Sequence, residues 1–476
     1  MNFQSFGFLA FFLASLLVTL LAQRRSQRHA EWSMLLFSLG AYCYVEPRAA
    51  ALMLLSCAVT FCSVRFFEWA PHRRRVYAFA VFWQILVLVW FKYMNFFLST
   101  ADRQTLTHSF IPLGISFFTF QQIWYLKECY EGAFTRVEGR QFLLVSFFYP
   151  SVSSGPILHP QSVLPQLEES NVFRPTWDDA AAGLYIIAVG LGKKVLLADN
   201  IAVFVNKGWA NLEALTVSES WCVILGFTLQ LYFDFSGYCD IATGFARCMG
   251  IRLPMNFNSP YRAISLNDFW KRWHITLTTF LRECVYIPLG GNRKGKFRTY
   301  LNLALVFLIS GIWHGAGWTF IVWGAIHAAV MVIERLIGEG RLQKLPKLLR
   351  RVLTFALVNV TWVFFRAPDL ASAMQMLKTA CGLPVYLPAA WLGEGMLSME
   401  QRALVYLFPQ VEAIWGSAVI LFFLLVGLFV VMVRGNAQRK VKHFHPTWKK
   451  TVLTAALLTL SLLSFTGVST FLYVNF

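Results

Sequence analysis

The chain has 476 residues, of which 57% are hydrophobic and 14% are charged. This composition excludes a soluble globular protein, because one core cannot bury so much apolar surface, and it predicts a polytopic membrane protein. The formal net charge of +18 does not indicate nucleic-acid binding, because lysine and arginine gather in short loops between apolar runs.

The longest apolar runs predict membrane-spanning helices. They lie at residues 3–21, 76–88, 415–433 and 451–471, with shorter runs between them. The predicted fold class is an all-α integral membrane protein, a bundle of about eleven transmembrane helices with additional re-entrant and interfacial helices. We expect a single membrane-embedded domain over residues 1–476. Its parts are N-terminal helices in 1–100, a motif-rich core in 110–330 and C-terminal helices in 353–476.

The basic loops predict the sides of the membrane. Lysine and arginine cluster at residues 24–28, 73–75, 293–298, 341–351 and 434–450. Such clusters mark the cytoplasmic side, so we expect these loops inside and both chain termini outside.

Two early segments interrupt their apolar surroundings. Residues 111–120 carry a proline and a glycine within an apolar run, and residues 150–160 place serines between two further breaks. Broken helices at membrane depth occur where protein covers the freed backbone groups or where a cavity is lined. The second segment therefore predicts a re-entrant element.

The stretch 256–298 is the least membrane-like part of the chain. Lys271, Arg272 and His274 alternate there with aromatic residues, which predicts an interfacial helix whose basic face meets headgroups or an anionic cofactor. A plain aromatic and basic membrane anchor explains the same spacing equally well.

His314 lies at the tip of an apolar segment between two predicted cytoplasmic loops. A polar side chain at membrane depth costs several kcal/mol unless it is paired, and it therefore marks a candidate functional site. Gly311, Gly315 and Gly317 surround it, and glycine lets another backbone or a ligand approach closely. The alternative is a core histidine that bonds to neighbouring backbone.

The nine cysteines are scattered singly, and no Cys or His spacing matches a metal site. The sequence therefore predicts neither a disulfide framework nor a bound metal.

Seven motifs in order resemble the bacterial membrane-bound O-acyltransferases of the alginate O-acetylation type. They are PLGISFFTFQ at 112–121, GPI at 155–157, YFDFSGY at 232–238, NFNSPY at 256–261, FWKRWH at 269–274, YIPLGGNR at 286–293 and WHG at 313–315. Three positions depart from the motifs. Glu128 and Glu283 stand where aspartate is common, and His159 follows GPI where arginine is common.

The resemblance implies transfer of an acyl group, with acetyl expected, from a cytoplasmic thioester such as acetyl-CoA. His314 corresponds to the family's catalytic histidine and His274 to its second motif histidine. A neutral imidazole suits the removal of a hydroxyl proton. The residues expected to support the site or bind the donor are Lys271, Arg272, Trp313, Asp234, Asp268 and Arg293. We expect Asp234 and Asp268 to pair with Arg or His rather than to act as catalysts.

The resemblance also implies a multi-pass protein of a bacterial cell membrane, a polysaccharide acceptor outside or in the periplasm, and a partner protein that completes transfer there. The last residues fit an FxYxxF pattern, in which Tyr473 is predicted to carry the acyl group across. An aromatic belt that anchors the last helix is the alternative for these residues.

Two other functions share these features. An acyltransferase that modifies a lipid, a protein or teichoic acid would share His314 and differ in its acceptor. A transporter would also bury polar residues in broken helices, although it should show repeat-related halves, which the sequence lacks.

Overall fold

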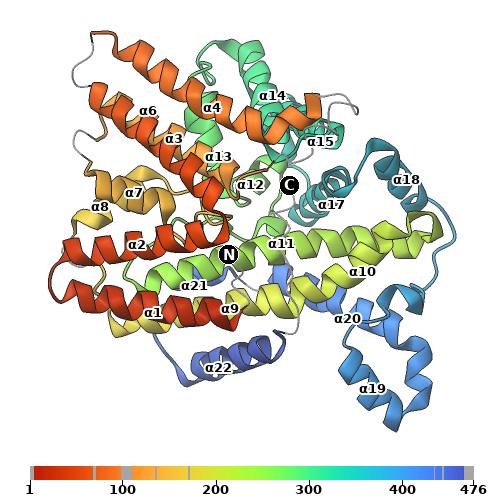
Figure 1. The fold of residues 1–476 in the computed structure, drawn as a ribbon. Coiled ribbons are helices and arrows are strands. Elements are labelled where there is room, and N and C mark those ends of the chain that lie inside the picture. Colours follow the sequence, from red (N-terminus) through yellow and green to blue (C-terminus); the bar gives the residue numbers. More distant parts are fainter. Residues whose placement is uncertain are drawn as a thin grey trace.

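The computed structural model describes residues 5–67, 71–97, 110–134, 137–169, 172–433, 435–441 and 444–465. Throughout these ranges the regular structure is helical, with no strand, which confirms the predicted fold class (Figure 1). Tyr473 and its neighbours lie outside the described residues.

Eight helical segments in the described part of the chain are long and apolar enough to cross a membrane. They are Phe6–Gln23, Pro47–Phe66, Arg73–Met94, Trp177–Ala210, Val217–Cys248, Trp318–Ile337, Lys347–Arg366 and Pro409–Arg439. Among the described residues, four further helices of 16 to 20 residues are α2 (Gln27–Val45), α6 (Ile115–Glu131), α14 (Gly295–His314) and α22 (Trp448–Leu463). Each of these four has charged residues near one end, so the described residues do not fix the expected total of about eleven.

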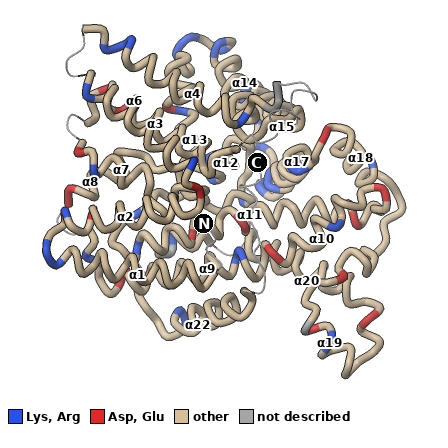
Figure 2. Tube along the Cα trace, in the orientation of Figure 1, with Lys and Arg blue, Asp and Glu red and all other residues tan. Residues whose placement is uncertain are grey.

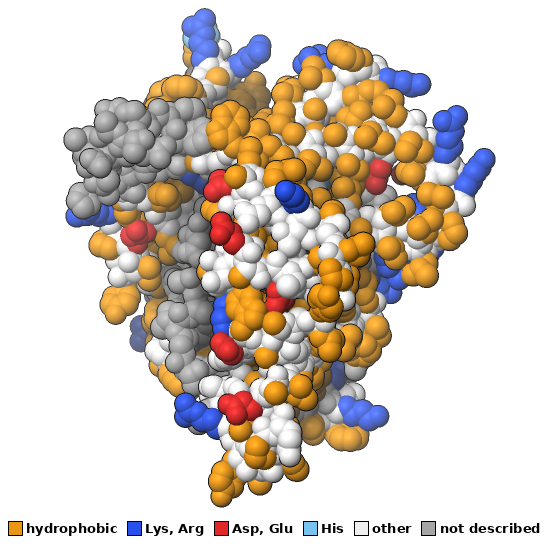
Figure 3. Space-filling view, turned by 90° about the vertical axis from the view of Figure 1, so that its right-hand side faces the viewer, with side chains coloured by type: hydrophobic (Ala, Val, Ile, Leu, Met, Phe, Trp, Pro, Cys, Tyr) orange, Lys and Arg blue, Asp and Glu red, His pale blue; other side chains and the backbone are white. Residues whose placement is uncertain are grey.

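The basic residues lie mainly near the ends of the helices. Figure 2 shows lysine and arginine mainly near helix termini and connections, with long uncharged stretches between them. In Figure 3, hydrophobic side chains cover much of the visible face, and most basic side chains stand toward its margins. This distribution is typical of a protein whose middle part lies in the lipid bilayer.

The long helix α11 (Val217–Cys248) crosses the middle of the bundle, and α9 (Trp177–Leu191) lies along it (Figure 1). Glycines allow the two backbones to approach closely. A Cβ on Gly190 would lie 2.7 Å from the Gly237 carbonyl oxygen, and one on Gly183 would lie 2.8 Å from the Gly244 oxygen. The paired glycines are seven residues apart on each helix, so they recur on one face after two turns.

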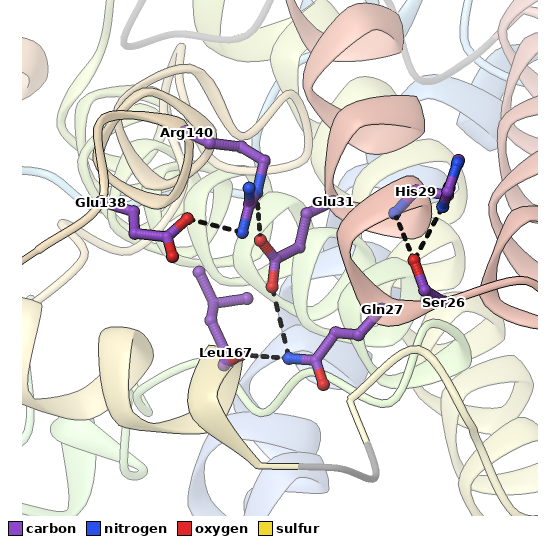
Figure 4. Close-up of polar contacts among 7 residues, drawn as sticks. All are labelled: Ser26, Gln27, His29, Glu31, Glu138, Arg140 and Leu167. Atoms are coloured by element: carbon purple, nitrogen blue, oxygen red, sulfur yellow. Dashed lines mark hydrogen bonds and ion pairs between the residues drawn. The ribbon is translucent and has the colours of Figure 1, made fainter.

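A buried ion pair joins the first helices to the core. Glu31 of α2, which is 1% exposed, accepts a 2.5 Å bond from Arg140 of α7 (Gly139–Phe147). Gln27 donates to Glu31 and to the Leu167 carbonyl at the end of α8 (Pro160–Glu168), as Figure 4 shows. These bonds tie α2, α7 and α8 together near one end of the bundle.

The predicted interfacial helix around Lys271 and Arg272 is wrong as a single helix. The structure has two short helices, α12 (Leu266–Trp270) and α13 (Ile275–Leu281), and His274 between them has a left-handed φ of 44°. Backbone bonds to the preceding non-helical segment hold the break: the Asn256 carbonyl accepts a 2.9 Å bond from the Ile275 N–H, and the Asn258 N–H donates to the Arg272 carbonyl. Of residues 150–160, which were predicted as re-entrant, 150–158 form a buried segment of turns and coil, and Pro160 begins α8.

Candidate active site

His314 is the last residue of α14, which returns through Gly315 and Gly317 into α15 (Trp318–Ile337). The chain therefore turns directly after His314, which the sequence placed at the tip of this apolar segment. A Cβ on Gly311 would lie 2.4 Å from the Phe320 carbonyl oxygen, so only glycine lets the start of α15 pack this closely against α14. The close packing fixes where the α14 terminus, and with it His314, is placed.

Aromatic rings surround the His314 imidazole, which is 3% exposed. Its ring centroid lies 4.8 Å from Trp313, 5.2 Å from Trp323 and 5.1 Å from Phe365, all in edge contacts. Edge contacts on several sides restrict the rotation of the imidazole, so its orientation is defined by packing.

Lys92, from α4 (Arg73–Phe97), secures the end of α14. Its ammonium group donates to the carbonyls of Trp313 at 2.6 Å and His314 at 3.2 Å, and to the Ser116 hydroxyl at 3.3 Å. A cation at a helix C-terminus satisfies the last carbonyls and complements the helix dipole. Lys92 therefore positions the turn that carries His314.

His274 lies behind Trp313 and is fully buried. Its ring centroid is 6.2 Å from that of Trp313, and its Nδ1 donates to Asn256 Oδ1 at 3.2 Å. The same oxygen accepts bonds from the amide and hydroxyl of Thr276. Burial lowers the pKa of His274 to about 3, so this imidazole is neutral.

A cavity of about 350 Å³ reaches His314, and we call it the histidine cavity. Besides His314, its polar lining includes Lys92, Glu46 and three serines, Ser116, Ser153 and Ser154. The segment 111–117, which carries the predicted Pro-Gly break, forms another part of the wall. The non-helical residues 111–114 and the first turn of the helix that follows thus line a cavity, as the interrupted apolar run predicts.

A second cavity of about 840 Å³ lies along the earlier turns of α14, and we call it the basic cavity. It extends along α14 from Leu303 to Ser310, one turn before His314. Its charged lining contains five basic and three acidic side chains: Lys271, Arg272, Arg282, Arg335, Arg350, Asp268, Glu334 and Glu339. Neither His274 nor His314 lines the basic cavity.

The predicted supporting residues fall into separate places. Lys271, Arg272 and Asp268 line the basic cavity, where Asp268 pairs with Arg272 at 2.7 Å. Asp234 lies in α11 and pairs with Lys194 at 2.6 Å. Arg293 is exposed on a turn and lines neither cavity.

Several residues of the site were not predicted from the sequence. Lys92 carried a usable signal, because a lysine inside an apolar run is costly without a function or a partner. Asn256 was noted only as part of a motif. Arg335 and Arg350 reach the basic cavity from distant helices, and nothing in their local sequence shows this.

Comparison with known proteins identifies the family of the chain. The sequence model of the MBOAT, membrane-bound O-acyltransferase, family matches residues 81–367. The peptidoglycan O-acetyltransferase of Helicobacter pylori is 37% identical over 422 residues, which cover 80% of this chain and 78% of that protein.

Two further relatives align with a smaller share of the chain. A Pseudomonas aeruginosa protein named probable alginate O-acetylase AlgI is 39% identical over 62% of this chain and 58% of its own length. The teichoic acid D-alanyltransferase of Bacillus subtilis is 28% identical over 49% of this chain and 62% of its own length. The chain belongs to the membrane-bound O-acyltransferase family, and it is a multi-pass membrane acyltransferase.

Proposed function

We propose that this protein transfers an acetyl group from cytoplasmic acetyl-CoA through the membrane for O-acetylation of an extracellular or periplasmic polysaccharide. The observation that carries the proposal is that two cavities reach neighbouring turns of α14, one basic and one ending at His314. The names of the relatives at 37–39% identity, which act on peptidoglycan and alginate, favour a polysaccharide as the final acceptor.

The basic cavity suits the donor. Coenzyme A carries phosphates, and Lys271, Arg282 and Arg335 offer charged hydrogen bonds to phosphate oxygens. The apolar part of its wall, which includes Phe307 and Leu303, suits the pantetheine arm. The thioester at the tip of that arm would reach the α14 turn that holds His314.

The chemistry needs one proton carrier. The neutral His314 imidazole takes the proton from the acceptor hydroxyl, and the hydroxyl oxygen attacks the thioester carbonyl carbon. The tetrahedral intermediate then expels the CoA thiolate, which receives the proton from His314. The ester forms as the thioester breaks, and His314 returns to its neutral state.

His274 does not reach either cavity, and in this proposal it acts through Trp313. Its bond to Asn256 and its contact with the Trp313 ring hold that ring, which in turn contacts His314. His274 is thus a positioning residue.

The test is acetyl transfer by purified protein in liposomes with labelled acetyl-CoA. His314→Ala is expected to lower turnover by roughly 10²- to 10⁴-fold, the usual contribution of a general base. His29→Ala, at an exposed position that bonds Ser26, is the matched control and should retain activity (Figure 4). Near-normal turnover by folded His314→Ala would exclude His314 as the base.

We further propose that Tyr473 carries the acyl group toward the acceptor or a partner protein. A phenol with a pKa near 10 is a poor nucleophile unless a base activates it, and His314 is the available base. Tyr473→Phe should preserve insertion and abolish acetylation of the polysaccharide, and mass spectrometry of the wild type should find an acetyl adduct on Tyr473. Full acetylation by Tyr473→Phe would leave the residue as a membrane anchor only.

A further inference from the structure

Three side chains from segments far apart in the sequence meet in space. Glu128 comes from α6 (Ile115–Glu131), His159 immediately precedes α8, and Glu283 lies in the short π-helix η4 (Arg282–Tyr286). One possible ligand atom from each lies within 4.8 Å of the other two. We call this set the Glu-His-Glu cluster.

The spacing of the three side chains fits a common metal ion. His159 Nε2 lies 3.0 Å from Glu128 Oε1 and 3.5 Å from Glu283 Oε2. Metal–ligand bonds of ~2.0–2.1 Å in a tetrahedral site place neighbouring ligand atoms ~3.3 Å apart. Both distances can reach that value with shifts of a few tenths of an ångström.

Glu128 supplies a second, independent observation. Its side chain is 4% exposed, and its Oε2 atom has no hydrogen-bond partner among the described residues. A buried carboxylate oxygen normally has a partner, because leaving it without one costs the full desolvation penalty. A cation that Glu128 binds through both carboxylate oxygens would give Oε2 its missing partner.

The surroundings resemble those of ligands in known metal sites. Trp124 donates from Nε1 to Glu283 Oε2 at 3.1 Å, and its ring packs edge-on against His159 at 4.2 Å. Such outer contacts orient ligands in metal sites. His159 and Glu283 are 19% and 26% exposed, so an ion can enter from the surface.

We propose that Glu128, His159 and Glu283 bind one divalent transition-metal ion. One imidazole nitrogen and two carboxylate oxygens form a ligand set typical of Zn²⁺ and of related ions, with a fourth position left for water. The ion joins α6, the start of α8 and η4, three segments that are far apart in the sequence.

The site has a route of contact to His314. Trp124 packs against Phe280 at 5.7 Å, and Phe280 stacks on Phe120 at 4.0 Å. Phe120 in turn stacks on Trp313 at 5.0 Å, next to His314. The ion therefore stabilises the packing behind the catalytic turn, and it takes no part in bond making.

The test uses full-length protein purified in detergent through a tag without histidine and dialysed against a chelator. Titration with ZnCl₂ should give one bound ion per chain by elemental analysis and should raise Tm. Co²⁺ should give the visible absorption of a low-coordinate site.

His159→Arg is the decisive variant, because arginine can contact both glutamates and supplies a positive charge in place of the ion, but it has no lone pair for a metal. It should fold, bind Zn²⁺ more than about tenfold more weakly, and lose the Tm shift. His72→Arg, at an exposed position, is the matched control and should bind as the wild type does.

If His159→Arg does not fold, Glu283→Gln at the partly exposed position gives the same comparison. Wild-type binding below one ion per chain, or equal Zn²⁺ affinity in the wild type and the cluster variants, would overturn the proposal. The cluster would then be a structural contact of His159 with two carboxylates and no ion.

Discussion

At His314 the position of the imidazole depends on residues that never meet a substrate. The aromatic rings of Trp313, Trp323 and Phe365 limit its rotation, and Lys92 holds the backbone from which it projects. The WHG motif was enough to select His314 from the sequence. Lys92 was not selected, because its role requires α4 and α14 to lie side by side, and no local pattern shows this.

We predict that Lys92→Met lowers kcat while the KM for the donor changes little. The variant leaves the carbonyls of Trp313 and His314 without their charged donor and lets the α14 terminus shift. A small misplacement of a catalytic group costs up to about 100-fold in rate. Steady-state kinetics with purified protein would measure both constants.

Lys378→Met, at an exposed position of α18 (Leu370–Ala380), controls for the loss of one lysine. A change confined to the donor KM would contradict the positioning role of Lys92 and would place it at the donor instead.

Among the helices, α9 and α11 show how far local sequence can predict packing. Both segments are apolar enough for membrane-spanning helices, yet the register that sets Gly190 against Gly237 depends on residues far apart in the sequence. The helix break at His274 could not be predicted from the neighbouring residues either, because it is held by bonds to Asn256, eighteen residues earlier in the chain. The sequence also contained no indication of the Glu-His-Glu cluster. Its three members come from distant segments and do not have the spacing of a metal-binding motif.

Gly190→Ala is expected to destabilise the bundle by about 1–3 kcal/mol, the usual cost of overpacking. The new Cβ would lie 2.7 Å from the Gly237 carbonyl oxygen, and a backbone atom cannot turn aside as a side chain can. Gly40→Ala is the matched helical control, because nothing lies within 4 Å of its Cβ position. Thermal unfolding in detergent would compare them, and equal Tm values would contradict the close helix contact.

For the whole molecule, the basic loops predict an orientation that the proposed function requires. The basic cavity is lined by residues beside the predicted cytoplasmic loops at 293–298 and 341–351, and the histidine cavity by residues beside the turn at 45–46. The positive-inside pattern then assigns the first cavity to the donor side and the second to the acceptor side.

Single cysteines introduced into a background without exposed native cysteines should report this orientation. Arg293→Cys and Lys440→Cys should react with a membrane-impermeant thiol reagent only from the cytoplasmic side. Tyr406→Cys, which replaces a side chain that is 87% exposed, should react only from outside. Labelling of position 440 from outside would show that the final spans are assigned to the wrong sides.

The nearness of the two cavities has an electrical consequence. Ser310 borders one and His314 borders the other, four residues apart, or roughly 6 Å of helix. If water fills both, the membrane voltage that elsewhere falls over ~30 Å of hydrocarbon falls here across this short partition. Each proton that His314 carries through the partition then exchanges ~2.3 kcal/mol with the field per 100 mV. An acyltransferase built in this way must transfer an acyl group without leaking ions across the membrane. Its turnover rate then depends on the membrane voltage.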